Sequence, residues 1–385
     1  MHSTEEKYKS RTNAKNPWMN IFSSDFQKII NGGFKSMKSK FFVLFLIITM
    51  IGVVFGEGKA EKETRVEQAA KEKYVFYFPS HIGGADPNMQ VWQKAIEDFQ
   101  ELFPVEIKYF ATTEFSIESF KQYIETSIAA KPDGIMVPVV DPVAVEEPLR
   151  RAIKNGIPVM ALNIPDPRPF NEKIPYLGFV GEDSIATGRA LARRVLQEFA
   201  PAKPKHAAAA VALIGHVSLE QRAQGFIEEM KANGVKAERV ATDLPETHAK
   251  ETMTAYIMKN PDVDVIFSTA TYNTPWMWSV MTQLNKTKEI TLVSVDASPT
   301  SLEAVAQWEN PDPNVPKAVA THSQNMFMQV WYAAEALYIY NRYGMEPPSI
   351  IATGPIVIDS SNVETWQMIV KGFFGDKGYN DNILW

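Results

Sequence analysis

From residue 74 onward, short apolar segments alternate with longer segments whose apolar residues recur every three or four positions. A segment that stays apolar along its length is typical of a strand buried on both faces, whereas the longer spacing is typical of a helix with one buried face. The first pair is YVFYFPS at residues 74–80 and VWQKAIEDFQELF at residues 91–103. Such alternation predicts parallel sheets covered by helices.

The alternation runs through two successive series of similar size. The first series has predicted strands at residues 74–80, 105–110, 134–139, 157–163 and 176–181, with helices at 91–103, 116–130 and 145–156. The second series has predicted strands at residues 209–215, 236–242, 263–269 and 290–296, with helices at 184–199, 220–232, 250–259 and 275–284. We therefore predict an α/β protein with two lobes, each built on a doubly wound parallel sheet.

The segment KAVATHSQNMFMQVW at residues 317–331 breaks this rhythm. A strand is predicted at residues 317–321, and polar residues follow it before a helical apolar pattern begins. The polar residues are His322, Ser323, Gln324 and Asn325. None of them is Gly or Pro, the residues that most often form turns. This composition indicates a role other than turn formation.

Composition excludes several classes of function. The chain has 385 residues, no cysteine, six histidines and a formal charge of −6. Without cysteine there are no disulfides, thiolate nucleophiles or cysteine-ligated metals, and the histidines are too dispersed for a short metal-binding motif. The negative charge gives no reason to expect nucleic acid as a partner. The chain also lacks Walker, G-x-S-x-G, H-E-x-x-H and dinucleotide-binding motifs, so we expect neither an enzyme nor a cofactor.

The N-terminal region has the pattern of an export signal. MKSKFFVLFLIITMIGVVFG at residues 37–56 has two lysines followed by an unbroken apolar run and small or apolar residues suited to cleavage. We interpret it as a signal peptide, with an uncleaved membrane anchor as the alternative. Residues 1–36 are interpreted as an upstream extension, since a signal rarely begins so far into a chain, and the charged residues 57–73 as a spacer. The mature protein is expected in the periplasm.

Polar residues gather where the predicted strands end, which is where doubly wound sheets bind ligands. They are Asp86, Asn88, Asn163, Arg222, Asn273, Asp296 and Gln324. One such residue alone is most often a helix N-cap, but the whole set lies on one edge of the two predicted sheets. Carboxylates and amides can bridge neighbouring hydroxyl groups, and an arginine donates in a planar fork. The set therefore indicates a ligand rich in hydroxyl groups.

Aromatic rings and histidines add to this set. Tyr272, Trp276, Trp92 and Trp278 are candidates to stack on the C–H face of a sugar or cyclitol, although each alone is more often a core residue. His81 and His322 lie at the predicted edge as well. They are candidate general bases, and hydrogen-bonding to a ligand is the more economical interpretation.

Several segments resemble the type I periplasmic sugar-binding proteins of the ribose/galactose-binding class. PDGIMVPVVDPVAVEEPLRRAIKNGIPVMALN at residues 132–163 is similar to the unit from their third to their fourth strand, and GFVGEDSIATGRALA at residues 178–192 to their first crossover. QRAQGFIEEM at residues 221–230 resembles the R-x-x-G-F segment that supplies a ligand-binding arginine. VSVDASP at residues 293–299 and AVATHSQ at residues 318–324 resemble strands that end in a ligand-binding Asp and Gln. The similarity extends in order over residues 73–360.

This resemblance implies a set of ligand contacts. They are Asp86, Asn163, Arg222, Asn273, Asp296 and Gln324, and we add Asn88, His81, Tyr272 and Trp276 as further candidates. The chain departs from the family where Asn163 stands in place of an Asp-Arg or Asp-rich pair and where the loops after the first strand and after Thr269 are longer. These departures leave pentoses, hexoses, cyclitols and other polyols open as ligands.

The resemblance also implies a function. The chain is expected to be a monomeric solute-binding protein that delivers a sugar or polyol to the membrane permease of an ABC importer. Its lobes are expected at residues 74–180 plus 325–354 and at residues 181–324 plus 355–385, with crossings near Val180, Gln324 and residues 354–358. They would close on the ligand by hinge motion.

The alternatives within this fold are a binding protein for a nucleoside or autoinducer, and a partner that presents its ligand to a chemoreceptor or sensor kinase. A transcription regulator of the lactose-repressor kind would need a DNA-binding motif where residues 37–56 carry the export signal.

Overall fold

The computed structural model describes residues 72–83, 88–111 and 116–384. These residues belong to one compact unit, Arg65–Trp385. The predicted signal peptide, most of the spacer and Asp86 lie outside the described residues. Within the described ranges, no helix is both long enough and apolar enough to cross a membrane.

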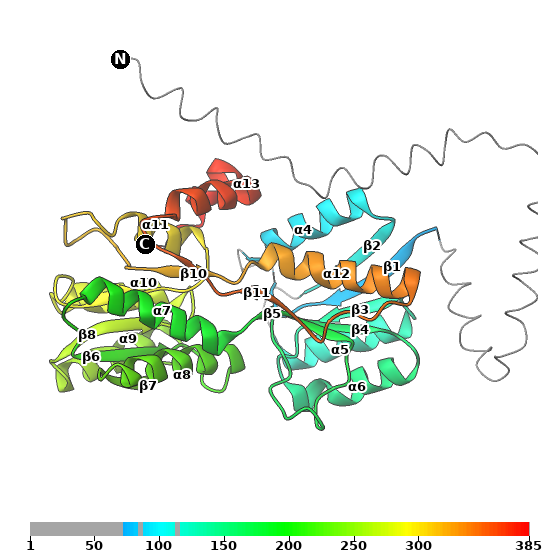
Figure 1. Ribbon diagram of the computed structural model, residues 1–385, viewed down its shortest axis with the longest axis horizontal. Helices are drawn as coiled ribbons and strands as arrows, with labels where there is room; N and C mark the ends of the chain where they lie inside the picture. The colour runs from blue at the N-terminus through cyan, green and yellow to red at the C-terminus, as the bar shows by residue number, and fades with distance from the viewer. Residues whose placement is uncertain (1–71, 84–87, 112–115, 385) are drawn as a thin grey trace, which may run out of the picture. The chain divides into compact units, whose positions relative to one another are not determined.

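A six-stranded parallel sheet with helices on both faces forms the first part of the fold (Figure 1). Its strands, in spatial order, are β11 (Ile350–Gly354), β5 (Gly178–Glu182), β4 (Val159–Leu162), β3 (Gly134–Val137), β1 (Tyr74–Pro79) and β2 (Val105–Phe110). Helices α4 (Asn88–Leu102) and α12 (Met326–Tyr343) pack on one face, where Phe76, Phe78 and Trp92 are fully buried. Helices α5 (Ile117–Ala129) and α6 (Pro142–Lys154) pack on the other, over Ile135 and Val137. We call this part the first lobe.

A four-stranded parallel sheet with helices on both faces forms the second part of the fold. Its strands, in spatial order, are β7 (Lys236–Ala241), β6 (His206–Val211), β8 (Val263–Ser268) and β9 (Thr291–Val293). Helices α7 (Ser184–Phe199) and α8 (Val217–Ala232) cover one face, and α9 (Glu246–Lys259), α10 (Asn273–Gln283), α11 (Pro299–Ala306) and α13 (Val363–Asp381) pack against the core on the other. Every residue of the central strand β6 is buried, as its continuous apolar sequence predicts. We call this part the second lobe.

The chain passes between the two sheets at three adjacent places. β5 leads into α7, β10 (Thr321–Ser323) leads into α12, and β11 leads into β12 (Ile356–Ile358). β5 and β11 are parallel neighbours, β10 and β12 form an antiparallel pair, and the Thr353 hydroxyl donates to the carbonyl of Gln324 at 2.8 Å. The predicted fold class is therefore confirmed, while the exact lobe boundaries stay a prediction.

The structure corrects the strand predicted at residues 317–321. Residues 319 and 320 run beside β9 through backbone hydrogen bonds to Leu292 and Ser294, but the assigned strand β10 is Thr321–Ser323. The polar residues His322 and Ser323 therefore lie within the strand. The turn into α12 is made by Asn325 with a left-handed φ of 55°, a conformation that Asn adopts more readily than most residues.

A close helix crossing positions the second lobe's arginine. A Cβ atom at Gly188 in α7 would lie 2.0 Å from the backbone oxygen of Arg222 in α8, and one at Gly225 would lie 2.0 Å from the backbone oxygen of Ile185. Only glycine allows the two backbones to approach this closely. The contact holds α8 against α7 next to Arg222.

We expect Gly188→Ala to lower the free energy of unfolding by about 1–3 kcal/mol, because the added methyl group forces the two backbones apart. Urea denaturation followed by circular dichroism measures this. The matched control is Gly372→Ala in α13, where a Cβ would meet nothing within 4 Å. That change should stabilise the helix by about 0.5–1 kcal/mol. Equal stability of Gly188→Ala and the wild type would show that the helices do not need this approach.

Candidate functional site

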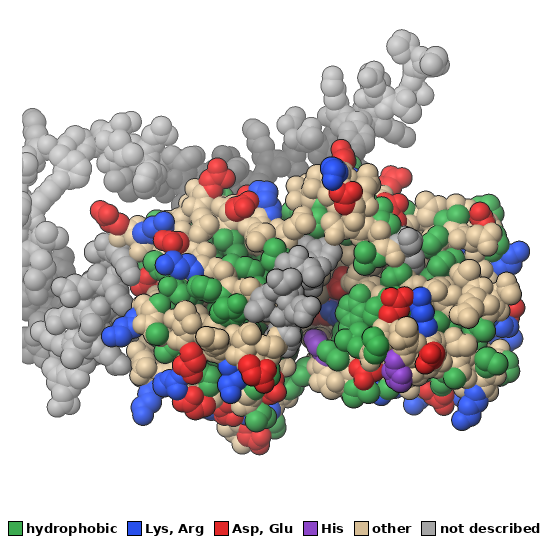
Figure 2. Space-filling view, turned by 180° about the vertical axis from the view of Figure 1, so that it is seen from behind, with side chains coloured by type: hydrophobic (Ala, Val, Ile, Leu, Met, Phe, Trp, Pro, Cys, Tyr) green, Lys and Arg blue, Asp and Glu red, His purple; other side chains and the backbone are tan. Residues whose placement is uncertain are grey.

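A cavity of about 460 Å³ lies where the carboxyl ends of the strands of both sheets face one another. This volume is within the usual range for small-molecule sites. The candidate residues that line it are His81, Asn88, Asn163, Arg222, Tyr272, Asp296 and Gln324. Asn163 comes from the first lobe, and Arg222 and Asp296 come from the second, so the cavity draws its polar groups from both lobes. On the face of the molecule shown in Figure 2, Lys and Arg side chains are interspersed with Asp and Glu side chains.

Two of the lining residues follow strands in a left-handed backbone conformation. Asn163 after β4 has φ 65°, and Asp296 after β9 has φ 62°. Non-glycine residues adopt this region infrequently, and Asn and Asp are the types that tolerate it best. The sequence therefore places residues that accept this conformation where the chain turns at the edge of the cavity.

A row of hydrogen bonds joins the two lobes across the cavity wall. The Asn163 side-chain amide donates to Gln324 Oε1 at 2.9 Å and to Gln329 Oε1 at 3.0 Å. The Gln324 side-chain amide donates to Asp296 Oδ1 at 2.8 Å, and Thr271 donates to Asp296 Oδ2 at 2.7 Å. Asn163 belongs to the first lobe and Asp296 to the second, so Gln324 connects them.

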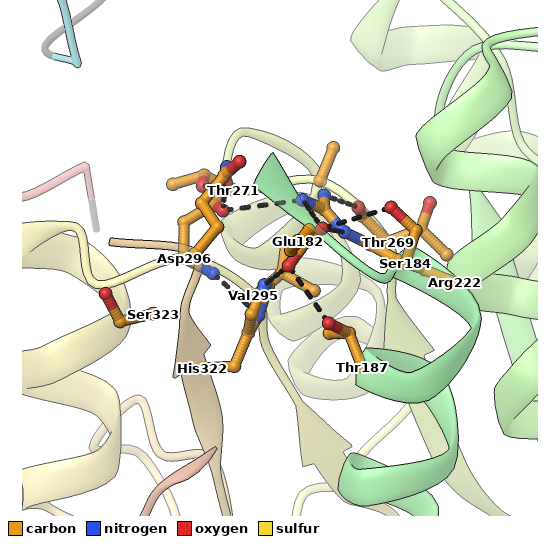
Figure 3. A network of polar contacts seen from close by, with 12 residues as sticks. Glu182, Ser184, Thr187, Arg222, Thr269, Thr271, Val295, Asp296, His322 and Ser323 are labelled. Atoms are coloured by element: carbon orange, nitrogen blue, oxygen red, sulfur yellow. Dashed lines mark hydrogen bonds and ion pairs between the residues drawn. The ribbon is translucent and has the colours of Figure 1, made fainter. Parts of the chain in front are cut away.

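Arg222 and Glu182 form a buried ion pair behind this row (Figure 3). Arg222 Nε and Nη2 donate to Glu182 Oε1 at 2.8 and 2.6 Å, and Nη1 donates to the carbonyl of Thr269 at 3.2 Å. Glu182 also accepts from Ser184, Thr187 and His322. Because the Glu182 side chain is 1% exposed, its charge is satisfied entirely within the protein.

Electrostatics keep Glu182 ionised despite its burial. Burial is the largest single influence and opposes ionisation, but the positive charge of Arg222, together with the His322 ring and the hydrogen bonds from both, holds the pKa of Glu182 well below its usual range. Burial likewise opposes protonation of Arg222, and the carboxylates of Glu182 and Asp296 raise the pKa of Arg222. The site therefore contains a permanent ion pair.

The hydrogen bonds of His322 define its protonation state. Its Nδ1 accepts from the backbone N–H of Asp296 at 3.3 Å, and its Nε2 lies 2.7 Å from Glu182 Oε2. A ring nitrogen that accepts carries no proton, so Nε2 carries the proton and donates to Glu182. His322 is thus a neutral bridge between β10 and the end of β5.

His81 and His216 lie on the cavity wall, one from each lobe. Burial lowers the pKa of His81 to about 3, with a further contribution from His216. Burial and the charge of Arg222 lower the pKa of His216 to about 4. Both rings are therefore neutral near pH 7 and offer hydrogen bonds rather than charge.

Four further predicted residues, all within the described ranges, do not line the cavity. Asn273 is fully buried at the start of α10, where its side-chain amide donates to the carbonyl of Ala210 at 3.4 Å. Trp276 packs against the core of the second lobe and contacts the Tyr272 ring. Trp92 and Trp278 are core residues, as expected for most aromatic side chains.

The sequence analysis missed several residues at the site. Glu182, His216, Thr271, Ser218, Ser298 and Thr300 were not predicted. Residues of the C-terminal segment, Asn382 and Leu384, also line the cavity. Thr300 holds that segment, since its hydroxyl donates to the Asn382 carbonyl at 3.1 Å and accepts from the Leu384 N–H at 3.0 Å. Glu182, His216, Thr271 and Ser298 had a signal in the sequence, since each is a polar residue one or two positions after the end of a predicted strand.

Metal chemistry has little support in this part of the chain. Among residues 72–83, 88–111 and 116–384, no group of three or more His, Asp or Glu side chains could hold a metal ion. The arrangement instead offers carboxylate, amide, hydroxyl, guanidinium and imidazole groups converging on one cavity. Such a set can hydrogen-bond several hydroxyl groups of one ligand.

Comparisons with known proteins agree with this geometry. A curated relative, the xylose/arabinose-binding protein XylF of Sulfolobus acidocaldarius, is 28% identical over 163 residues, which are 41% of this chain and 40% of that protein. The match therefore spans less than half of that relative. A carbohydrate transporter from Acidothermus cellulolyticus, solved in complex with myo-inositol, is 20% identical with a TM-score of 0.66 and covers 78% of this chain and 99% of its own.

A periplasmic sugar-binding protein from Legionella pneumophila has the same fold. It is 22% identical with a TM-score of 0.64, and the alignment covers 73% of this chain and all of that one. The family model described as a periplasmic binding protein domain matches residues 80–342. This match includes parts of both lobes and all the lining residues except those of the C-terminal segment. The chain therefore belongs to the periplasmic binding protein family.

Proposed function

We propose that this protein is an exported solute-binding protein that captures a sugar or polyol in the interlobe cavity and delivers it to the permease of an ABC importer. The observation that carries the proposal is the row from Asn163 through Gln324 to Asp296, in which amide and carboxylate groups of both lobes meet at one cavity. Arg222 lies within 3.8 Å of Asp296 at the same wall. These groups match the hydroxyl groups of a sugar better than an apolar or metal ligand.

Ligand capture would couple to closure at the three adjacent crossings. Gln324 follows β10 directly and bonds residues of both lobes, so a change in the angle between lobes would change its contacts. Hydrogen bonds formed by the ligand to both lobes would favour the closed arrangement by mass action. The closed protein is the form we propose for delivery to the permease.

The ligand names of relatives support this class of ligand. XylF is named for xylose and arabinose, and the Acidothermus structure holds myo-inositol. A nucleoside-binding protein would be expected to stack the base between aromatic rings. Among the described residues that line the cavity, Tyr272 is the only aromatic residue other than the histidines. A single ring of this kind cannot enclose a base from both sides, so the cavity favours a polyhydroxy ligand.

The test is a calorimetric titration of the exported protein with pentoses, hexoses and inositols, with intrinsic tryptophan fluorescence as a second signal. We expect saturable one-site binding of at least one of them. Absence of binding across all three classes, in protein whose unfolding transition is cooperative, would contradict the proposal. Binding of a nucleoside in their place would support the alternative ligand class.

Acidification should weaken ligand binding. The pKa values of His81 and His216 are lowered to about 3 and about 4 from an ordinary value of 6.5. Opening of the cavity would hydrate the rings and restore ordinary values, so between pH 6.5 and about 4 the open form binds more protons. The effect is absent above pH 6.5 and grows as the pH falls, by up to about tenfold in affinity per pH unit for each histidine.

Titrations at pH 7.5, 6.0 and 5.0 measure this dependence. The double variant His81→Gln/His216→Gln should show a flatter profile, whatever its affinity at pH 7.5. Glu182 stays ionised throughout this interval because its pKa lies below its usual range. A wild-type affinity that is constant from pH 7.5 to 5.0 would contradict the prediction.

A further inference from the structure

The positive charge of Arg222 is already satisfied before any ligand arrives. Its Nε and Nη2 groups donate to Glu182, its Nη1 group donates to the Thr269 carbonyl, and Nη2 lies 3.8 Å from Asp296 Oδ1. The Arg222 side chain is 5% exposed, so little of the guanidinium meets the cavity. An arginine committed in this way has few free donors and little unbalanced charge for a ligand.

The balance of charge at this wall is negative. Among the described residues that line the cavity, Arg222 and Asp296 carry charge. Adding Glu182 behind them gives one positive and two negative groups, a net charge of −1. His322 adds no charge because its Nδ1 accepts a hydrogen bond from Asp296 N–H. Asp296, with its side chain 12% exposed, is therefore the charged group that a ligand meets more directly.

Glu182 is held beside Arg222 by three further hydrogen bonds. Ser184 donates to Oε1 at 3.2 Å, while Thr187 at 3.0 Å and His322 at 2.7 Å donate to Oε2 (Figure 3). These donors come from α7 and β10, on either side of the ion pair. Both oxygens of the carboxylate are thus hydrogen-bonded, which favours the position beside Arg222.

We propose, resting on the proposed function, that Glu182 is a positioning residue that sets ligand charge selectivity: by committing Arg222, it makes the cavity accept neutral polyhydroxy ligands and reject their carboxylate and phosphate derivatives. Without Glu182, Arg222 would be free to pair with an anion, as arginine does at carboxylate and phosphate sites. With Glu182 present, an anionic ligand loses its hydration and meets Asp296 without gaining a free arginine.

The experiment compares matched ligands by calorimetry at pH 7.5: D-xylose with D-xylonate, D-glucose with D-glucuronate, and myo-inositol with a myo-inositol monophosphate. The affinity ratio of the neutral to the anionic member is measured for the wild type and for Glu182→Gln, which keeps the shape and removes the charge. We expect a wild-type ratio above about 100-fold, and a ratio at least about tenfold smaller in Glu182→Gln. Anion binding by this variant should weaken as salt is raised.

Two further variants make the comparison specific. Glu182→Asp retains the charge and should retain selectivity against the anionic member, which a merely structural role for Glu182 would not predict. Asp166→Asn removes a different fully buried carboxylate, one paired with Arg168 at 2.7 Å outside the cavity. It should leave the neutral-to-anionic ratio unchanged.

The outcomes separate this inference from the proposed function. If no neutral member binds the wild type, the proposed function fails and the inference falls with it. If a neutral member binds but its anionic partner binds within about tenfold, the inference alone is overturned. An unchanged ratio in folded Glu182→Gln also overturns it. If Glu182→Gln does not fold, the neutral-to-anionic affinity ratios of the wild type and of Glu182→Asp test the inference. A loss of selectivity in either protein contradicts the proposed role of the Glu182 charge.

Discussion

Arg222→Leu should lower the free energy of unfolding by about 3–5 kcal/mol, the usual cost of removing one partner of a buried ion pair. The substitution leaves the Glu182 carboxylate, which is 1% exposed, without its main compensating charge. The hydrogen bonds from Ser184, Thr187 and His322 remain but are too weak to replace a guanidinium. Urea denaturation of the ligand-free protein at pH 7.5 measures the change.

The matched control is Arg239→Leu, which breaks a more exposed pair. Arg239 bonds Glu220 at 2.6 Å, but their side chains are 37% and 31% exposed. Its loss should cost about 1 kcal/mol or less. The double variant Glu182→Leu/Arg222→Leu should recover much of the stability lost in Arg222→Leu, since no unpaired charge is then buried. Equal costs for Arg222→Leu and Arg239→Leu would show that the Glu182–Arg222 pair does not stabilise the fold.

The pH dependence of this effect has a definite sign. The pKa of Glu182 in the folded wild type lies below its unfolded value: burial raises it, but the positive charge of Arg222 and the hydrogen bonds from Arg222 and His322 together lower it by more. Its contribution to stability is therefore present above the unfolded pKa and is lost as the pH falls towards the folded pKa. In Arg222→Leu the carboxyl group can protonate more readily, so the difference in stability between the two proteins should shrink in acid.

The fold could be predicted because its signals are local. Helix α7 was predicted with the bounds that the structure has, and β2 likewise, since apolar periodicity and strand length decide both. The strand β6 begins at His206 instead of Ala209, because the pattern gives no sign that a buried histidine starts a strand. His206 is accommodated by Tyr256 at 2.9 Å, a partner fifty residues away in the sequence.

The site could be predicted only where it depends on strand ends. Asn163, Asp296 and Gln324, which line the cavity, were predicted as candidates because each stands at or near the end of a strand. Asn273 was predicted as a ligand contact, but α10 begins at that residue, and its side-chain amide donates to the carbonyl of Ala210 in β6. The direction of a side chain at a helix start depends on the φ and ψ angles there, and these do not follow from residue type alone.

Glu182 escaped the prediction for a different reason. Its neighbour Asp183 caps α7 by accepting from Ala186 N–H at 2.9 Å, and an acidic pair before a helix is typical of a solvated helix start. The bond between Glu182 and Arg222 spans forty residues, and α7 and α8 cross closely at glycines beside it. Likewise, His322 was weighed as a ligand contact, whereas the structure directs its ring to Glu182.

Asp296→Ala should weaken ligand binding by about 2 kcal/mol or more, roughly 30-fold, because it removes a charged acceptor from hydroxyl groups of the ligand. The loss also leaves the Gln324 and Thr271 donors at 2.8 and 2.7 Å without their shared acceptor. Calorimetric titration with the ligand that the wild type binds measures the change. Asp312→Ala, at an exposed loop carboxylate that bonds Asn314 N–H, is the control and should bind as the wild type does.

Stability separates a binding role of Asp296 from a structural one. Asp296 as a whole residue is 8% exposed. Its partner Arg222 keeps its closer contacts with Glu182 when the Asp296 side chain is removed. The free energy of unfolding should therefore change much less in Asp296→Ala than in Arg222→Leu, while ligand affinity falls. Asp296→Asn should lie between the wild type and Asp296→Ala in affinity, since an amide oxygen can still accept from Thr271 or from a ligand hydroxyl. If Asp296→Ala binds the ligand as tightly as the wild type, Asp296 does not contact the ligand.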